Sequence, residues 1–231
     1  MSLIEVRNLT KFYGPRPAIY DLSLNLEAGQ VVGLMGDNGA GKTTLLKILA
    51  GLLADWQGSV TIAGKTPGPE TKAMVSYLPD VSFLRPNLTP ELAIAQYARF
   101  FADFDQERAH QMIEYFGLAP TQRLKEMSKG MQEKVQISLT MARNANVYLL
   151  DEPISGVDPA SREIIMRGII TQFAPQSLML LSTHLVHDVE PIVDSVVFLR
   201  AGQVLLAGNA DELRSQYQMG LDALFRKVYQ A

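Results

Sequence analysis

One glycine-rich segment, residues 36–44 with the sequence GDNGAGKTT, combines residue types that bind phosphate. An apolar stretch at 31–35 precedes it, and an apolar helical pattern at 45–49 follows it. Glycines let the backbone curl so that successive N–H groups can surround an anion, and the positive end of a following helix adds to the attraction. A strand, a glycine-rich loop and a helix in this order form a P-loop, which predicts a site for the phosphates of a nucleotide.

Lys42 and Thr43 stand where this phosphate loop, residues 36–44, becomes the helix. Lys42 can place a positive charge on the β- and γ-phosphates, and the Thr43 hydroxyl is a hard oxygen ligand suited to Mg²⁺. A tight turn can also be rich in glycine for steric reasons alone, but here both the pattern and its flanks match the phosphate-binding motif. The predicted nucleotide contacts of the loop are Gly36, Asn38, Gly39, Ala40, Gly41, Lys42, Thr43 and Thr44.

Carboxylates and a histidine follow further predicted strands. The apolar strand at 147–150 ends at Asp151 and Glu152. Two adjacent carboxylates at the end of a buried strand are costly unless they face a cation or take part in a reaction. Asp80 ends an earlier strand, where open α/β sheets bind ligands, although a solvated turn is also a common place for aspartate. His184 follows a later strand, and a single histidine there also has a structural interpretation.

Tyr13 and Ser128 each have a structural and a functional interpretation. Tyr13 lies in the segment 10–14 between the first two predicted strands, where its ring could stack on an adenine or pack against the protein. Ser128 is placed to cap a helix in which Met131 and Val135 would face inward. Residue type alone leaves both alternatives open.

The elements that must position these residues alternate between strand and helix around the phosphate loop. This alternation predicts a mostly parallel sheet with right-handed crossovers. Strands at 4–6 and 20–26 alternate apolar and polar side chains, which is typical of half-exposed antiparallel strands. Asp158 and Pro159 begin another helix, and residues 196–206 form a hairpin at the sheet edge.

The segment between the phosphate loop and Asp151 contains helices that have their own start and stop signals. One helix begins at Thr89 with Pro90 in its first turn, and Leu92 and Phe100 are among its apolar residues. The next has one apolar face and ends at Gly117. We therefore predict an α/β fold with a P-loop NTPase core, a mostly parallel sheet, an N-terminal antiparallel β subdomain and an inserted α-helical subdomain. A single domain would cover 1–231, with the helical subdomain at about 81–145 and a C-terminal helical extension at about 209–231.

Composition limits the classes of protein to consider. The chain has 231 residues, 47% hydrophobic and 19% charged, which suits one large domain. Its net charge of −3 gives no sign of a nucleic-acid surface, and the absence of cysteine excludes disulfides and thiolate metal sites while agreeing with a reducing cytosol. The acidic residue Glu5 argues against a secretory signal, and the apolar runs are too short or interrupted for a membrane span. A role at a membrane would need a partner.

Taken in order, these motifs resemble the ATP-binding cassette (ABC) ATPases, and they look closest to the single-cassette ATPase subunits of bacterial ABC exporters. The segments that carry the resemblance are Tyr13 and its neighbours, the phosphate loop, residues 77–80, 127–131, 151–152, 155–158 and 182–184. In that family the position of Tyr13 stacks on adenine. Ser128, Gly130 and Met131 match the signature that binds the γ-phosphate of ATP held by the other subunit.

The resemblance also implies catalytic roles. Glu152 would be the general base for the attacking water, His184 would contact the γ-phosphate and orient that water, and Lys42 would bind the phosphates. The implied metal residues are Thr43, Asp80 and Asp151, and Asp158 would link the sites of two subunits.

Two departures from the family pattern affect these roles. The signature commonly reads LSGGQ, whereas here Lys129 replaces the first glycine and Met131 the glutamine. Lysine brings a cation near a polyphosphate, and methionine loses an amide. Asp80 stands where the family commonly has glutamine; its oxygens suit a metal, but the side chain is shorter and charged.

The implied function is that of an ATP-binding and ATP-hydrolysing subunit of an ABC transporter. It would dimerise on ATP with a second ABC ATPase subunit, identical or not, and power a separate transmembrane permease subunit for export, at the cytoplasmic face of the cell membrane. Phe83 and Leu84, after Asp80, would anchor a helix of the permease or else pack within the helical lobe. The alternative is a soluble ABC-type ATPase acting on a macromolecule in DNA repair, translation or cofactor assembly, but the chain has neither the long coiled coils nor the second cassette of those relatives.

Overall fold

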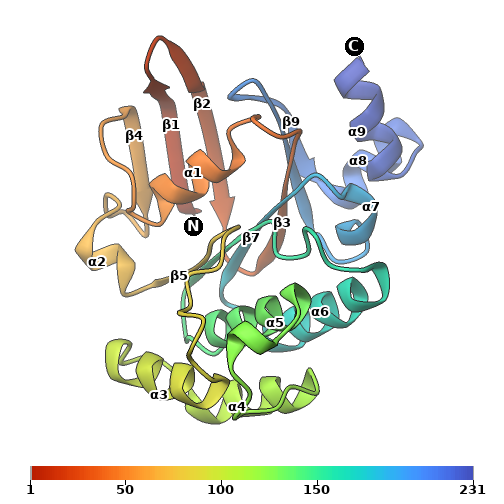
Figure 1. Ribbon diagram of the computed structural model, residues 1–231. Helices are drawn as coiled ribbons and strands as arrows, with labels where there is room; N and C mark the ends of the chain where they lie inside the picture. The colour runs from red at the N-terminus through yellow and green to blue at the C-terminus, as the bar shows by residue number, and fades with distance from the viewer. Residues whose placement is uncertain (1, 231) are drawn as a thin grey trace.

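Two β-sheets form the framework of the computed structural model, which describes residues 2–230 (Figure 1). The strands are β1 (Ser2–Tyr13), β2 (Arg16–Glu27), β3 (Gln30–Met35), β4 (Gln57–Ile62), β5 (Val75–Leu78), β6 (Val147–Asp151), β7 (Leu178–Thr183), β8 (Ser195–Arg200) and β9 (Gln203–Asn209). The smaller sheet has the order β2-β1-β4 and is antiparallel. The larger has the order β5-β6-β7-β3-β8-β9; its first five strands are parallel, and β9 pairs with β8 as an antiparallel edge strand.

Helices connect the parallel strands, and five of the helices begin at a side-chain cap. The α-helices are α1 (Lys42–Leu49), α2 (Pro69–Lys72), α3 (Pro90–Phe100), α4 (Gln106–Tyr115), α5 (Lys129–Met141), α6 (Pro159–Gln172), α7 (Val186–Val189), α8 (Ala210–Tyr217) and α9 (Leu221–Gln230). A short 3₁₀ helix covers Leu124–Glu126. The oxygen of each of five cap residues accepts a hydrogen bond from a backbone N–H of the first turn; these residues are Thr89, Asp105, Ser128, Asp158 and Asn209.

The central parallel strands of the larger sheet are buried on both faces, as parallel strands usually are. Strand β6 shows the alternation: Tyr148 and Leu150 belong to one hydrophobic core, whereas Val147 and Leu149 belong to the other. The first core includes residues of α3 to α9, and the second includes α1 and the antiparallel sheet. Among the described residues, no helix combines the length and apolarity needed to cross a bilayer.

The predicted fold class is confirmed, and so are the edge hairpin β8–β9 and the buried face of α4. One local expectation was wrong. Strand β1 runs through Tyr13, which is therefore in a strand rather than a loop. In α3, Leu92 and Phe100 are 55% and 72% exposed. Residues three and four positions apart share a helix face, and in α3 that inward face is formed by Ala93, Ile94 and Tyr97.

Candidate functional site

The carboxyl ends of three neighbouring parallel strands meet at one edge of the larger sheet. Met35 of β3 pairs with Thr183 of β7, and Asp151 of β6 pairs with Ser182 of β7. The segments that follow these strands therefore start side by side, although they are far apart in the sequence. Ligands bind at this edge in open α/β sheets.

Glycine is required in the phosphate loop for two different reasons. Gly39 and Gly41 have φ values of 84° and 106°, in the left-handed region that favours glycine. At Gly36 a Cβ atom would lie 2.6 Å from the carbonyl oxygen of Leu199, and at Gly41 it would lie 2.6 Å from that of Ala18. The loop is thus both curled and closely packed against its surroundings.

The helix that follows the loop begins with free hydrogen-bond donors. Ala40 donates its N–H to the Asp37 carbonyl, and Leu45 donates to Gly41. The N–H groups of residues 41–44 have no acceptor within residues 2–230. Unpaired N–H groups at the positive end of a helix attract anions, so this end of α1 is suited to phosphate.

Lys42 is held across the phosphate loop. Its ammonium donates to the carbonyl oxygens of Gly36 at 2.6 Å and Asp37 at 3.2 Å. The same nitrogen is 3.2 Å from Oε1 of Glu152, a charge contact without hydrogen-bond geometry. A phosphate that binds Lys42 would consequently lie beside the Glu152 carboxylate.

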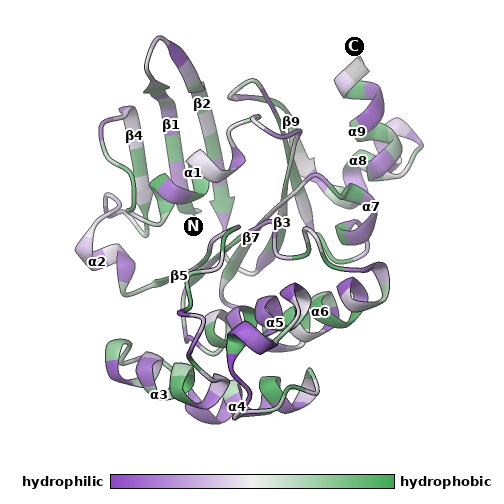
Figure 2. Ribbon diagram, viewed as in Figure 1, coloured by the Kyte–Doolittle hydropathy of each residue, from purple (hydrophilic) through white to green (hydrophobic). Residues whose placement is uncertain are grey.

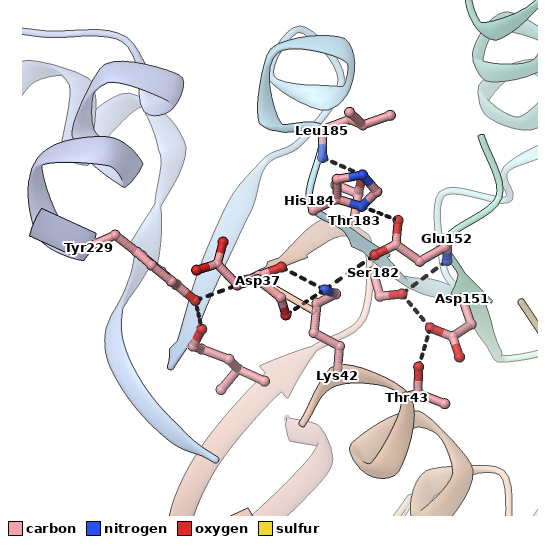
Figure 3. A network of polar contacts seen from close by, with 12 residues as sticks. Asp37, Lys42, Thr43, Asp151, Glu152, Ser182, Thr183, His184, Leu185 and Tyr229 are labelled. Atoms are coloured by element: carbon pink, nitrogen blue, oxygen red, sulfur yellow. Dashed lines mark hydrogen bonds and ion pairs between the residues drawn. The ribbon is translucent and has the colours of Figure 1, made fainter. Parts of the chain in front are cut away.

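Asp151 is a buried carboxylate with one side paired and the other free of partners. Its Oδ1 accepts from the hydroxyls of Thr43 at 3.1 Å and Ser182 at 2.6 Å, while Oδ2 is buried and finds no partner among the described residues (Figure 3). Burial raises the pKa of Asp151, although the two hydroxyls act in the opposite direction. A carboxylate and a hydroxyl are hard oxygen donors, so Thr43 and Asp151 fit Mg²⁺, which would compensate the buried charge.

Glu152 adopts a strained backbone conformation that its neighbours hold. Its φ is 51°, which is uncommon for a residue other than glycine. Its N–H donates to the Ser182 carbonyl oxygen at 3.1 Å and lies 3.0 Å from the Ser182 hydroxyl oxygen. Its Oε2 is 2.9 Å from Nδ1 of His184 (Figure 3). The strained turn therefore brings the carboxylate between Lys42 and His184.

Most of the predicted residues line one cleft, which we call the nucleotide cleft. Its lining includes Tyr13, Asn38, Gly39, Ala40, Gly41, Lys42, Thr43, Thr44, Asp80 and Glu152. Tyr13 is 54% exposed, so its ring is accessible for stacking on a base. Asp80 is exposed. Burial is the main cause of the raised pKa of Asp151, and the nearby negative charge of Asp80 raises that pKa further.

Four of the other predicted residues lie apart from the nucleotide cleft. Ser128, Gly130, Met131 and Asp158 line a second hollow, which we call the signature pocket. The Ser128 hydroxyl accepts from the Met131 N–H at 3.3 Å, and Asp158 accepts from the Ser161 N–H at 3.0 Å, a bond that lowers the pKa of Asp158. Among the described residues, none lines both the nucleotide cleft and the signature pocket.

Ser182 and Tyr229 contact the site but were not among the predicted residues. Ser182 connects Asp151 to Glu152, and the available signal was a polar side chain at the end of an otherwise apolar strand. Tyr229 accepts a hydrogen bond from the Asp37 N–H. No local pattern connects a tyrosine near the end of the chain with a loop that precedes it by 192 residues.

Fold and site together define a P-loop protein with an ATP-binding cassette arrangement. The ABC transporter family model matches residues 19–155. The ABC-type transporter ATP-binding protein EcsA of Bacillus subtilis is 32% identical over 242 aligned positions, which cover 99% of this chain and 97% of that protein. The Nod factor export ATP-binding protein I of Cupriavidus metallidurans is 26% identical, over 92% of this chain and 73% of its own length.

Two solved structures are similar in fold to this chain. An ATP-binding subunit of an ABC transporter superposes with a TM-score of 0.87 at 30% identity, covering 99% of this chain and all of that one. The ADP conformation of MJ1267, an ATP-binding cassette of an ABC transporter, has a TM-score of 0.80 at 21% identity and supports the fold. This chain belongs to the ABC transporter family, as an ATP-binding subunit.

Proposed function

We propose that this subunit hydrolyses ATP as one half of a dimer and drives a separate transmembrane permease. The observation that carries the proposal is the division of the predicted residues between the nucleotide cleft and the signature pocket. A second cassette, facing head to tail, would bring its signature pocket over the nucleotide cleft of the first. Each ATP would then be held by both subunits, and the partner cassette is either a second copy of this chain or a homologue.

The chemistry follows from the positions of the side chains. The N–H groups of residues 41–44 and Lys42 bind the phosphates. Thr43 and Asp151 would hold Mg²⁺, with Asp80 as a further oxygen donor from the cleft wall. A bound metal would supply positive charge to offset that of the β- and γ-phosphates.

Glu152 accepts a proton from the attacking water as general base. His184, 2.9 Å from the carboxylate, keeps it oriented and itself faces the γ-phosphate. Phosphoryl transfer depends mainly on positioning and charge, and the short distances between these groups supply both.

Closure around ATP and opening after hydrolysis would move the permease, which places the subunit at the cytoplasmic face of the cell membrane. Export is the proposed direction, in line with the export role in the name of the Cupriavidus relative. Phe83 is 39% exposed, and Leu84 packs partly against the first core, so Phe83 is the stronger candidate for contact with the permease.

Isolation of the native complex tests this proposal. The tagged chain is purified from detergent-solubilised membranes, and the bound proteins are identified by mass spectrometry. We expect one transmembrane protein in stoichiometric amount and ATP hydrolysis that requires Mg²⁺. Recovery with ribosomes, DNA or a soluble assembly, and without a membrane protein, would instead support the soluble alternative.

A further inference from the structure

The C-terminal helix α9 reaches the start of the phosphate loop through one side chain. The Tyr229 hydroxyl accepts a hydrogen bond from the Asp37 N–H at 3.2 Å (Figure 3). It donates its own proton to the Leu199 carbonyl near the end of β8. Burial raises the pKa of Tyr229, so the hydroxyl keeps the proton that it donates. One hydroxyl thus joins α9, β8 and the phosphate loop.

The space around this contact is closed. A Cβ atom on Gly36 would lie 2.6 Å from the Leu199 oxygen and 3.0 Å from the Tyr229 oxygen. A methyl group does not fit at the first distance and is crowded at the second. Glycine at position 36 therefore allows the loop to approach Leu199 and Tyr229 closely enough for the hydrogen bonds.

Helix α9 is fixed at both ends, so the position of Tyr229 is well determined. At its start, Leu221 and Asp222 donate their N–H groups to the Glu190 carboxylate at 2.7 and 3.3 Å. Further along, the Phe225 ring packs 4.3 Å from the Tyr229 ring and at right angles to a phenylalanine of β8, at 5.2 Å. Figure 2 shows both hydrophobic and hydrophilic residues along α9, and the hydrophobic ones recur every three or four positions, as expected for a helix packed on one side.

The contact extends to Lys42 through a single peptide group. The N–H of Asp37 and the C=O of Gly36 belong to the same planar peptide unit. Its N–H is bonded to Tyr229, and its oxygen accepts from the Lys42 ammonium at 2.6 Å. Holding one end of the unit fixes the direction of the other, and successive hydrogen bonds strengthen each other.

We propose that Tyr229 is a positioning residue of the nucleotide site, which orients the peptide between Gly36 and Asp37 and through it the Lys42 ammonium. The C-terminal helix is thereby part of the phosphate-binding apparatus. This inference rests on the proposed role of Lys42 in binding the phosphates of ATP.

The test removes only the hydroxyl. Tyr229→Phe keeps the ring and its packing. Tyr217→Phe on α8 is the matched control, because the hydroxyl of that partly buried tyrosine makes no hydrogen bond to another residue within 2–230. Three quantities are measured on the full chain: the Kd for ATP by calorimetry, the exchange rate of the Asp37 amide in the nucleotide-free protein by NMR, and Tm. For Tyr229→Phe we expect Kd and the exchange rate to rise about 2- to 10-fold, as for loss of one hydrogen bond, while Tyr217→Phe changes neither.

A double-mutant cycle tests the route through Lys42. If Tyr229 acts through this ammonium, Tyr229→Phe should change Kd far less in a Lys42→Ala background than in the wild type. A lower Tm with unchanged Kd and unchanged Asp37 exchange would reduce Tyr229 to a structural residue and overturn the proposal. If the wild-type chain does not bind ATP, the proposed function fails, and unchanged Asp37 exchange in Tyr229→Phe would still overturn the contact separately.

Discussion

Glu152 is distinguished from the other acids of the site by its surroundings. It lies between the Lys42 ammonium and the His184 ring, whereas Asp151 is bonded to two hydroxyls. We expect Glu152→Gln to keep ATP binding but to lower turnover by about 10²–10⁴, the range for loss of a general base. The measurements are the Kd for ATP, the hydrolysis rate, and dimer formation by light scattering with ATP, which should increase.

Glu163→Gln is the control for this substitution, since Glu163 is an exposed residue of α6 that pairs with Arg167. It should leave all three measurements unchanged. Near-normal turnover in Glu152→Gln would assign the base to another residue.

Lys42 and Lys129 have different places in the structure. Lys42 lies in the nucleotide cleft, whereas Lys129 lines the signature pocket and sits 3.8 Å from Glu133. Lys42→Ala should therefore weaken ATP binding by the monomer and abolish hydrolysis. Lys129→Gly should leave monomer affinity unchanged, because Lys129 would act on the ATP of the partner. Calorimetric titration of both variants with ATP measures the two affinities. An equal loss of affinity would contradict the placement of Lys129 in the site of the partner.

At the scale of elements, the junction between β6 and β7 depends on Ser182. Ser182→Ala removes one of the two hydroxyls on the buried Asp151 Oδ1 and one contact to the strained Glu152. Leaving a buried charged group with fewer partners costs about 1–3 kcal/mol, so we expect that loss in the free energy of unfolding, together with slower hydrolysis. Urea unfolding and the hydrolysis rate are the measurements.

Ser138→Ala provides the comparison. Ser138 is also fully buried, but its hydroxyl bonds a carbonyl of its own helix α5, and it lines neither the nucleotide cleft nor the signature pocket. Its replacement should cost less stability and leave hydrolysis unchanged. Equal effects of the two substitutions would mean that Ser182 has no particular role in the site.

Local patterns predicted the elements well, and they failed where distant segments meet. Caps at Ser128 and Asp158 and the strand before Asp151 depend on nearest neighbours, so the sequence alone is sufficient for them. The extension of β1 to Tyr13 depends on pairing with β2, and the contacts of Ser182 and Tyr229 depend on strand order and on the packing of α9. None of these long-range contacts produces a periodic pattern in the sequence.

At the scale of the whole molecule, the segment after Asp80 connects the nucleotide cleft with the helical part of the chain. The Phe83 N–H donates to the Gln136 side chain of α5 at 3.1 Å, and the Phe83 ring lies 6.2 Å from that of Tyr97 in α3. Helix α5 is capped by Ser128, in the signature pocket. A partner that contacts Phe83 would thus act on a segment that is joined both to Asp80 and to helix α5.

We therefore expect Phe83→Ala to reduce stimulation of hydrolysis by the permease while leaving basal hydrolysis nearly unchanged. Hydrolysis is measured for the isolated subunit and for the reconstituted complex, alongside Tm. Phe100→Ala is the control, since this α3 residue is more exposed, at 72% against 39%, and, within residues 2–230, lacks the hydrogen bond to α5 that Phe83 makes. If basal activity and Tm of Phe83→Ala fall together while stimulation persists, Phe83 contributes to packing, and the permease must contact another surface.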